Sequence, residues 1–330
     1  MAELPVQNQP TIDLIYKGYV DRNPDFRRAH LGASLIGKEC ERCLWYDFRW
    51  ATDPKFDGRM LRLFETGQKE EARIIDNLRS VGLEIYDREP DTGKQMNYSE
   101  PLFGHFGGSL DGIGIKFPEA LKTWHVLELK TSSKKLFEKL LKEGVEKAKP
   151  QHYAQVQVYM RWSKLERAMY IVYCKDDDRM YCERIYYDKD FAEQLVEKAR
   201  RVIYSAVPLE RLGSNINDFR CKFCDHIESC WGKSLPLVSC RTCAHVTPLE
   251  DGTWECGLDK TILSESKQKT PCERHIFIPN LVPLEMIGSD PEKGTIEYEG
   301  GIINGPGAIR SSDLYEKGIN NIKSNSGKSN

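Results

Sequence analysis

The segment HVLELKTSSKK, residues 125–135, decides the fold of the core because it places two opposite charges inside an apolar strand. Side chains two residues apart in a strand point to the same face. Glu128 and Lys130 therefore share one face, and Leu127 and Leu129 share the other. The ordinary interpretation is a half-exposed edge strand with a surface ion pair, so the rest of the sequence has to decide whether these charges form a site.

The sequence around this strand predicts a mixed α/β domain. Residues 58–82 have helical periodicity, with Asp57 as a candidate N-cap and Gly82 as a stop. Pro150 is suited to the first turn of a later helix. Further strands are expected at 83–87, 102–106, 109–115, 124–130, 167–174 and 180–187, and further helices at 132–144, from 150 onward, and at 190–206.

Two more carboxylates are candidates for the same site as Glu128. Asp111 lies among glycines in GGSLDGIG (107–114), where the backbone can bend, and a hairpin from Asp111 to Glu128 would bring both carboxylates together. Glu71 falls on the apolar stripe of the 58–82 helix, where an unpaired carboxylate is costly. Hard oxygen ligands of this kind favour Mg²⁺ or Mn²⁺.

The remaining candidates complete a site for phosphodiester hydrolysis. The backbone carbonyl of Leu129 is a further metal ligand, and Lys130 would position the attacking water and stabilise charge on phosphorus. Gln155 and Tyr159 lie one helical turn apart in HYAQVQVYM (152–160), where they could bind a phosphate or hold a catalytic lysine. An ordinary amphipathic helix is the alternative for this last pair.

The ordered set Glu71, Asp111, Glu128, Lys130 and Gln155 resembles the PD-(D/E)XK nuclease superfamily. Asp111 followed by Glu128-Leu129-Lys130 is similar to its D…(D/E)-x-K core, and AQVQVYM is similar to the Gln-x-x-x-Tyr motif of its RecB-like and lambda-exonuclease-like branch. The resemblance covers about residues 30–232. It implies a restriction-endonuclease-like core, in which a mixed sheet is flanked by helices, and a Glu at position 71 leans toward the viral exonuclease type.

A first cysteine group contains Cys221, Cys224 and Cys230 in CKFCDHIESCWG. Three thiolates are one short of the four that tetrahedral zinc and iron–sulfur clusters usually have. The layout resembles RecB-like iron–sulfur nucleases, including CRISPR-associated ones, and this implies that Cys40 completes a [4Fe–4S] cluster. Cys43 is an additional thiol that leaves the choice of ligand open, and zinc or unligated core cysteines are the alternatives.

A second cysteine group contains Cys240, Cys243, Cys256 and Cys272. The Cys-x-x-Cys pair followed by two more cysteines suits a small zinc-ribbon-like module, because so short and polar a segment needs a metal to fold. The alternative is a redox role or loosely paired thiols.

These assignments divide the 330 residues into four parts: a polar lead-in (1–30), a nuclease domain closed by a cysteine cluster (31–235), the metal-stapled cysteine module (236–280), and a hairpin with a flexible tail (281–330). The net charge of −2 argues against a protein that coats nucleic acid through bulk charge, although residues 130–149 hold seven Lys and three Glu. Eleven cysteines without a secretion signal indicate a reducing compartment.

We therefore expect a cytoplasmic, Mg²⁺-dependent DNA exonuclease from a bacterium or a phage-infected cell, with no membrane association. Its partner would be single- or double-stranded DNA ends in recombination, repair or replication, together with a recombination or replication protein. The sequence leaves the oligomeric state open. Two alternatives are a non-catalytic nucleic-acid-binding protein on a nuclease fold and a cysteine-cluster redox or metal sensor.

Overall fold

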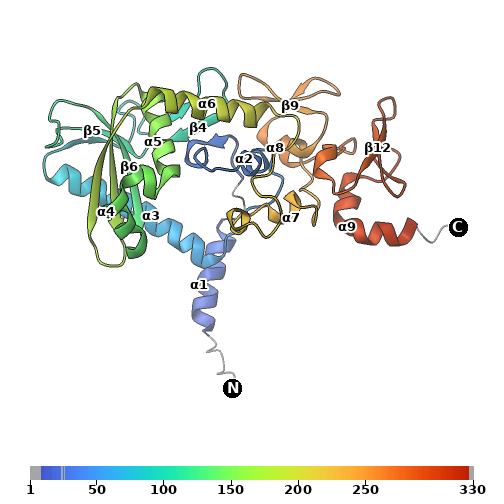
Figure 1. Ribbon diagram of the computed structural model, residues 1–330, viewed down its shortest axis with the longest axis horizontal. Helices are drawn as coiled ribbons and strands as arrows, with labels where there is room; N and C mark the ends of the chain where they lie inside the picture. The colour runs from blue at the N-terminus through green and yellow to red at the C-terminus, as the bar shows by residue number, and fades with distance from the viewer. Residues whose placement is uncertain (1–8, 24, 26, 327–330) are drawn as a thin grey trace.

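The computed structural model describes residues 9–23, 25 and 27–326, so residues 1–8, 24 and 26 of the expected lead-in and residues 327–330 of the expected tail lie outside it. Figure 1 shows an elongated molecule, with the main sheet and α4 at one end and the strands around β12 at the other. Helices and mixed sheets alternate along the chain, which confirms the α/β class. Among the described residues, no helix is both long enough and apolar enough to cross a membrane.

The main sheet has five strands in the order β2-β5-β6-β7-β8. The β6 and β7 strands are parallel, and the other neighbours are antiparallel. Because β6 is the central strand, the expected edge-strand alternative for residues 124–130 is wrong. The five strands are Glu84–Tyr86 (β2), Gly112–Ile115 (β5), His125–Ser132 (β6), Arg167–Cys174 (β7) and Met180–Tyr186 (β8).

The two faces of this sheet are covered by different helices. On one face, Ile74 and Ile75 of α3 (Gly58–Ser80) pack with Leu127 and Leu129 of β6. On the other face, α4 (Lys134–Ala148) and α5 (Pro150–Ser163) bury the larger core, which contains Val126. Helices therefore cover both faces of β6 and exclude water from the strand. This is why the face with Leu127 and Leu129 and the face with Val126 each belong to a core.

Helix boundaries follow the expected signals with one difference. The Asp57 side chain accepts a hydrogen bond from the Met60 backbone N–H at 2.7 Å, so α3 begins at its predicted N-cap. The backbone after α3 turns at Gly82 with a φ of 91°. In α4 the expected stop at Gly144 is a kink with a φ of 71°, after which a further turn continues to Ala148. Glycine tolerates this left-handed backbone, which explains why the helix is interrupted there.

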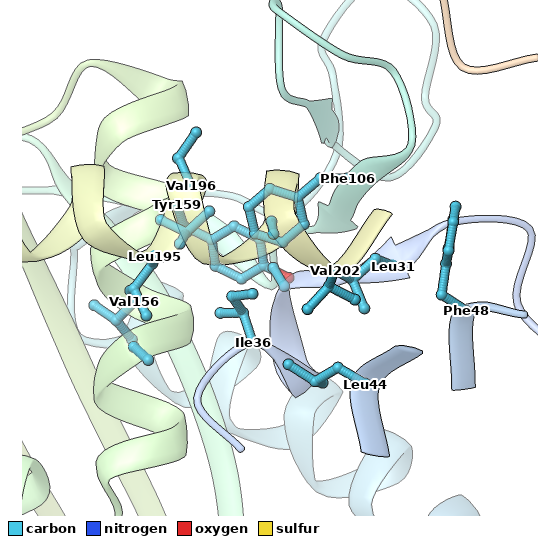
Figure 2. Close-up of a cluster of buried hydrophobic side chains, with 14 of the residues drawn as sticks. Leu31, Ile36, Leu44, Phe48, Phe106, Val156, Tyr159, Leu195, Val196 and Val202 are labelled. Carbon is cyan, nitrogen blue, oxygen red and sulfur yellow. The ribbon is translucent and has the colours of Figure 1, made fainter. Parts of the chain in front are cut away.

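A smaller sheet joins β1 (Leu31–Gly32), β4 (Phe106–Ser109) and β3 (Asn97–Ser99) in the order β1-β4-β3. The expected strand at 102–106 is wrong, because residues 101–105 form turns and the strand begins only at Phe106. Figure 2 shows the Phe106 ring among side chains from α5 and from α6 (Lys189–Tyr204), with Tyr159 of α5 beside it. Through Phe106, this sheet therefore packs the β4 segment, which precedes Asp111, against the main core.

Two N-terminal helices were not expected from the sequence. Residues 10–21 form α1 (Pro10–Asp21), which packs on α3. Residues 41–48 form α2 (Glu41–Phe48), an eight-residue helix whose Leu44, Trp45 and Tyr46 are buried. The polar lead-in thus supplies a helix, and α2 carries part of the core.

The C-terminal third contains two further three-stranded sheets. The first has the order β11-β10-β9 and the second the order β12-β13-β14. The hairpin expected within TIEYEGGIINGPG, residues 295–307, is confirmed by the antiparallel pairing of β13 with β14. The flexibility expected for the tail stays a prediction, and a helix, α9, extends through residue 326. These elements are Val246–Pro248 (β9), Trp254–Cys256 (β10), Thr261–Ile262 (β11), Met286–Asp290 (β12), Thr295–Tyr298 (β13), Ile302–Asn304 (β14) and Ser311–Ser326 (α9).

Candidate active site and cysteine groups

Asp111 and Glu128 come together because β5 and β6 are antiparallel neighbours. Gly112 pairs with Leu127, so Asp111 lies beside the middle of β6. The Asp111 Oδ2 atom accepts a hydrogen bond from the Leu129 backbone N–H at 2.7 Å. A Cβ atom at Gly112 would lie 2.9 Å from the Tyr86 carbonyl oxygen, which explains the need for glycine in this hairpin.

Glu128 and Lys130 form a pair at the centre of this site. The Glu128 side chain is 0% exposed, and its Oε1 lies 2.5 Å from Lys130 Nζ. The same ammonium lies 3.8 Å from Asp111 Oδ2 and donates a hydrogen bond to the Leu129 carbonyl oxygen at 3.1 Å. Among the described residues, the buried Glu128 Oε2 has no hydrogen-bond partner. A buried polar atom without a partner is unusual in a folded protein.

Burial and neighbouring charges have opposite effects on the pKa values of Glu128 and Lys130. Burial raises the pKa of Glu128 to about 8, although Lys130 lowers it in part. Burial alone would lower the pKa of Lys130, but the negative charges of Glu128, Asp111 and Glu71 outweigh it and raise that pKa. Lys130 therefore stays an ammonium ion and is the permanent positive charge of the site.

Glu71 approaches this pair from α3 without joining it closely. Its side chain is half-buried, and burial, followed by the charge of Asp111, raises the pKa of Glu71 to about 7. The oxygens of Glu71, Asp111 and Glu128 do not all lie within 4.8 Å of one another in the described part of the chain. The structure therefore brings Glu71 near enough to feel the charges of Asp111 and Lys130, without bringing the three carboxylates to metal-ligand spacing.

Gln155 and Tyr159 lie on the buried face of α5, behind the acidic residues. The Gln155 amide donates a hydrogen bond to the Tyr159 hydroxyl at 3.3 Å, and that hydroxyl donates to the Ser109 carbonyl at 2.8 Å. Burial, followed by the charge of Glu128, raises the pKa of Tyr159, so the phenol stays protonated. The two side chains therefore hold the strand end that carries Asp111.

His152 and Tyr170 are neighbours of the site that the sequence reasoning missed. The His152 ring nitrogen Nδ1 lies 2.7 Å from the Tyr170 hydroxyl. Burial, followed by the positive charge of Lys130, lowers the pKa of His152 to about 3, so the ring is neutral. The signal that could have found it is its position three residues before Gln155, since residues three apart share a helix face.

Five cysteines surround one small cavity between α2 and the loop that ends in α7 (Ile227–Cys230). Cys40, Cys43, Cys221, Cys224 and Cys230 line it. Cys40 is the N-cap of α2, and its sulfur accepts the Cys43 backbone N–H at 3.3 Å. After burial and the charge of Asp218, the thiols of Cys40, Cys224 and Cys230 add to the raised pKa of Cys221. The structure thus brings the four expected ligands together, with Cys43 as a fifth thiol.

Cys43 also belongs to a second arrangement of metal-type ligands, with Asp47 and His226, whose donor atoms lie within 4.8 Å of one another. Here Lys38 already supplies a positive charge, because its Nζ lies 2.9 Å from Asp47 Oδ2 and 3.6 Å from Cys43 Sγ. His226 bonds Asp47 Oδ1 at 3.0 Å and Thr52 Oγ1 at 2.6 Å through its two ring nitrogens. These contacts satisfy the group without a metal ion.

The second cysteine group lies on connecting segments of the C-terminal third. Cys240 begins the 3-10 helix η3 (Cys240–Thr242), and Cys243 follows it. Cys256 is the last residue of β10, and Cys272 comes three residues after α8 (Glu265–Lys269). All four cysteines are free thiols.

Comparison with known proteins gives neighbours in structure but none in sequence. No protein-family profile matches the chain, and no curated protein resembles its sequence significantly. One structural neighbour is the protein SSO0001, with a TM-score of 0.40, 16% identity and coverage of 68% of this chain and 96% of that one. Another is the alkaline exonuclease LHK-Exo from Laribacter hongkongensis, with a TM-score of 0.40, 16% identity and coverage of 56% and 90%. Its complex with dAMP gives the same TM-score, with 18% identity and coverage of 53% and 87%.

Proposed function

We propose that this protein is a divalent-metal-dependent DNA nuclease. The observation that carries the proposal is the fully buried Glu128 carboxylate, which has an unpartnered oxygen beside the Lys130 ammonium and beside Asp111. A buried carboxylate oxygen without a partner is costly, and a bound cation would relieve this cost. The motif resemblance of the same residues favours an exonuclease that processes DNA ends in recombination, repair or replication.

The donor set fits Mg²⁺ or Mn²⁺, because it consists of hard oxygens. Asp111, Glu128 and the Leu129 carbonyl would hold the ion, with Glu71 as a further ligand. A bound ion would lower the pKa of a water molecule and neutralise phosphate oxygens. Binding of the ion would favour the ionised form of Glu128, which burial disfavours in its absence.

The chain's own residues would orient and stabilise the reacting phosphate. The Lys130 ammonium, which is 24% exposed, can donate hydrogen bonds to phosphate oxygens that gain charge during the reaction. Asp111 is fixed by its bond from the Leu129 N–H, so its second oxygen keeps its direction. Gln155 and Tyr159 act as positioning residues through the Ser109 carbonyl.

The five-cysteine cavity supports the second part of the proposal, a [4Fe–4S] cluster on Cys40, Cys221, Cys224 and Cys230. The donor set of thiols in a largely apolar cavity fits such a group. A bound cluster would supply a cross-link between the N-terminus of α2 and the chain 180 residues later. An absorption band near 400 nm in anaerobically purified protein would distinguish it from zinc.

The test of the nuclease proposal uses linear DNA labelled at either end, single- or double-stranded, and closed circular DNA, with Mg²⁺ or with EDTA. We expect Mg²⁺-dependent release of nucleotides from linear DNA only. The variants Asp111→Asn and Lys130→Met should abolish release, whereas Lys189→Met, on the exposed surface of α6, should not. Binding of DNA without any release by the unsubstituted protein would instead support a non-catalytic binding protein. Cleavage of closed circles would indicate an endonuclease.

A further inference from the structure

The second cysteine group takes no part in the proposed nuclease site, and its four cysteines lie on neighbouring turns and strand ends. Cys240 and Cys243 lie at the two ends of the turn Cys240–Thr242, which the Cys243 N–H closes on the Cys240 carbonyl at 3.2 Å. Cys256 is brought beside this turn because β10 pairs with β9, with Cys256 opposite Val246. Cys272 sits on a similar turn, where the His275 N–H bonds its carbonyl at 3.1 Å.

Backbone hydrogen bonds bring the segments that carry the four thiols together. The Ala244 N–H donates to the Ile276 carbonyl at 2.9 Å, and Cys243 pairs with Phe277, so the turn that begins at Cys272 lies beside the Cys240–Cys243 turn. The Gly257 N–H donates to the His245 carbonyl at 2.7 Å, which brings the end of β10 to the same turn. Cysteine binds metal as a thiolate.

The turn between Cys240 and Cys243 also anchors the rest of the molecule. Arg241, which is 1% exposed, lies between these two thiols in the sequence and places its guanidinium 3.7 Å from the centre of the Trp50 ring. It donates hydrogen bonds to the Phe48 carbonyl at 2.9 Å and to the Ala29 carbonyl at 2.7 Å. Phe48 is the last residue of α2, so this arginine satisfies a free carbonyl at the C-terminal end of that helix.

We propose that Cys240, Cys243, Cys256 and Cys272 bind one Zn²⁺ ion that holds Arg241 against the end of α2. Four thiolates match the tetrahedral structural zinc sites of proteins. The thiols do not already meet the tight spacing of such a site, since no three of them lie within 4.8 Å among the described residues. Binding therefore requires the thiols to come closer together than they lie here, and Cys272 is exposed.

The proposal has a structural consequence for α2, whose two ends face the two cysteine groups. Its N-cap is Cys40, in the five-cysteine cavity, and its C-terminal carbonyl is held by Arg241. The helix has eight residues and spans about 12 Å. A zinc ion on the second group would therefore fix the helix from the end opposite to the first group. This inference stands independently of nuclease activity.

The test measures metal in the full-length protein, purified with reductant after expression in zinc-supplemented medium. We expect one zinc ion per chain, and the charge-transfer and d–d absorption of a tetrahedral thiolate site when Co²⁺ replaces zinc. Cys256→Ser and Cys272→Ser should each lose the zinc and the cobalt spectrum. Cys182→Ser, an exposed thiol on β8, is the matched control and should keep both. Cys221→Ser should also keep the zinc, because it belongs to the other group.

Chelation of the unsubstituted protein is a second test, which does not depend on whether the cysteine variants fold. Removal of zinc should lower the melting temperature, and addition of Zn²⁺ should restore it. The proposal is overturned if the purified protein holds no zinc and added Zn²⁺ leaves its melting temperature unchanged. It is equally overturned if Cys256→Ser and Cys272→Ser retain a full equivalent of zinc, or if mass spectrometry after alkylation finds these thiols joined as disulfides.

Discussion

The acidic site and the second cysteine group place their side chains by different means. Glu128 and Lys130 lie on the central strand of a five-stranded sheet, and Asp111 is bonded to the backbone of that strand. The four thiols instead lie at turns and strand ends, where little regular structure fixes them. The comparison teaches that sheet register is enough to place Asp111 beside Glu128, whereas turns alone leave the four thiols wider apart than metal ligands.

The largest expected effect comes from removing a charge of the sheet-borne site. Glu128→Gln keeps the shape of the side chain but removes its negative charge, and hydrolysis should fall by about a thousandfold or more. Unfolding in urea should show a smaller change, because relief of the buried carboxylate offsets the lost ion pair with Lys130, which keeps Asp111 as a partner at 3.8 Å. A large loss of stability in this variant would show that the charge supports the fold rather than the reaction. It would contradict the contrast drawn here between the acidic site and the second cysteine group.

The second effect concerns the anchor of the cysteine group. Arg241→Met fills the space but leaves the Phe48 and Ala29 carbonyl oxygens without their donor, which should lower the free energy of unfolding by about 3 kcal/mol. Zinc content should stay the same, because the four thiols are intact. Urea unfolding and metal analysis of the same sample check both results. If zinc is lost together with stability, the anchor and the metal site are one unit.

A third effect tests how tightly the strand before Asp111 is held. A Cβ atom at Gly108 would lie 2.7 Å from the Tyr159 hydroxyl, so Gly108→Ala should destabilise the protein by about 2 kcal/mol. Gly67→Ala is the control, because a Cβ atom there meets nothing within 4 Å and alanine is the better helix former. Thermal unfolding of the two variants should therefore shift in opposite directions. Equal shifts would mean that Tyr159 does not fix this strand.

The smallest expected effect is a pH dependence outside both groups. Burial lowers the pKa of His105 to about 4, where its ring lies between Phe48 and Trp254 and its Nε2 contacts the Thr253 carbonyl. The folded state then binds fewer protons than the unfolded state, so this contribution is complete above about pH 6.5 and is lost as the pH falls toward 4. Between pH 7.5 and 5.5 it amounts to about 1 kcal/mol.

The corresponding variant is His105→Gln, whose amide can still donate to the Thr253 carbonyl. Urea midpoints at the two pH values should differ less in this variant than in the unsubstituted protein. Parallel changes in both proteins would show that His105 contributes nothing to acid sensitivity.

Local signals in the sequence were sufficient for much of the main sheet and for its site. The alternation around Glu128 predicted which side chains share a face, and the glycines around Asp111 predicted the hairpin to β6. These features depend on neighbours along the chain or on one strand pairing, so a short window of sequence contains them.

Features that depend on distant contacts were missed. The α2 helix is short and has no strong amphipathic signal, and it is stabilised by burial of Trp45 and by capping through Cys40. Phe64 of α3 is 43% exposed and its ring contacts Phe56, an arrangement that helical periodicity alone does not predict. The role of Tyr159 could not be predicted either, since its partner Ser109 is 50 residues away.

The parallel pairing of β6 with β7 has a consequence for synthesis on the ribosome. A nascent chain that ends before Arg167 contains Asp111, Glu128 and Lys130, but its β6 strand still lacks one of its two neighbours. Parallel pairs need a long crossover, here α4 and α5, and such non-local pairing is slow to form. The candidate site is therefore assembled only after β7 has emerged, and a translation product that ends before Arg167 carries Asp111 and Glu128 on a sheet that has not closed.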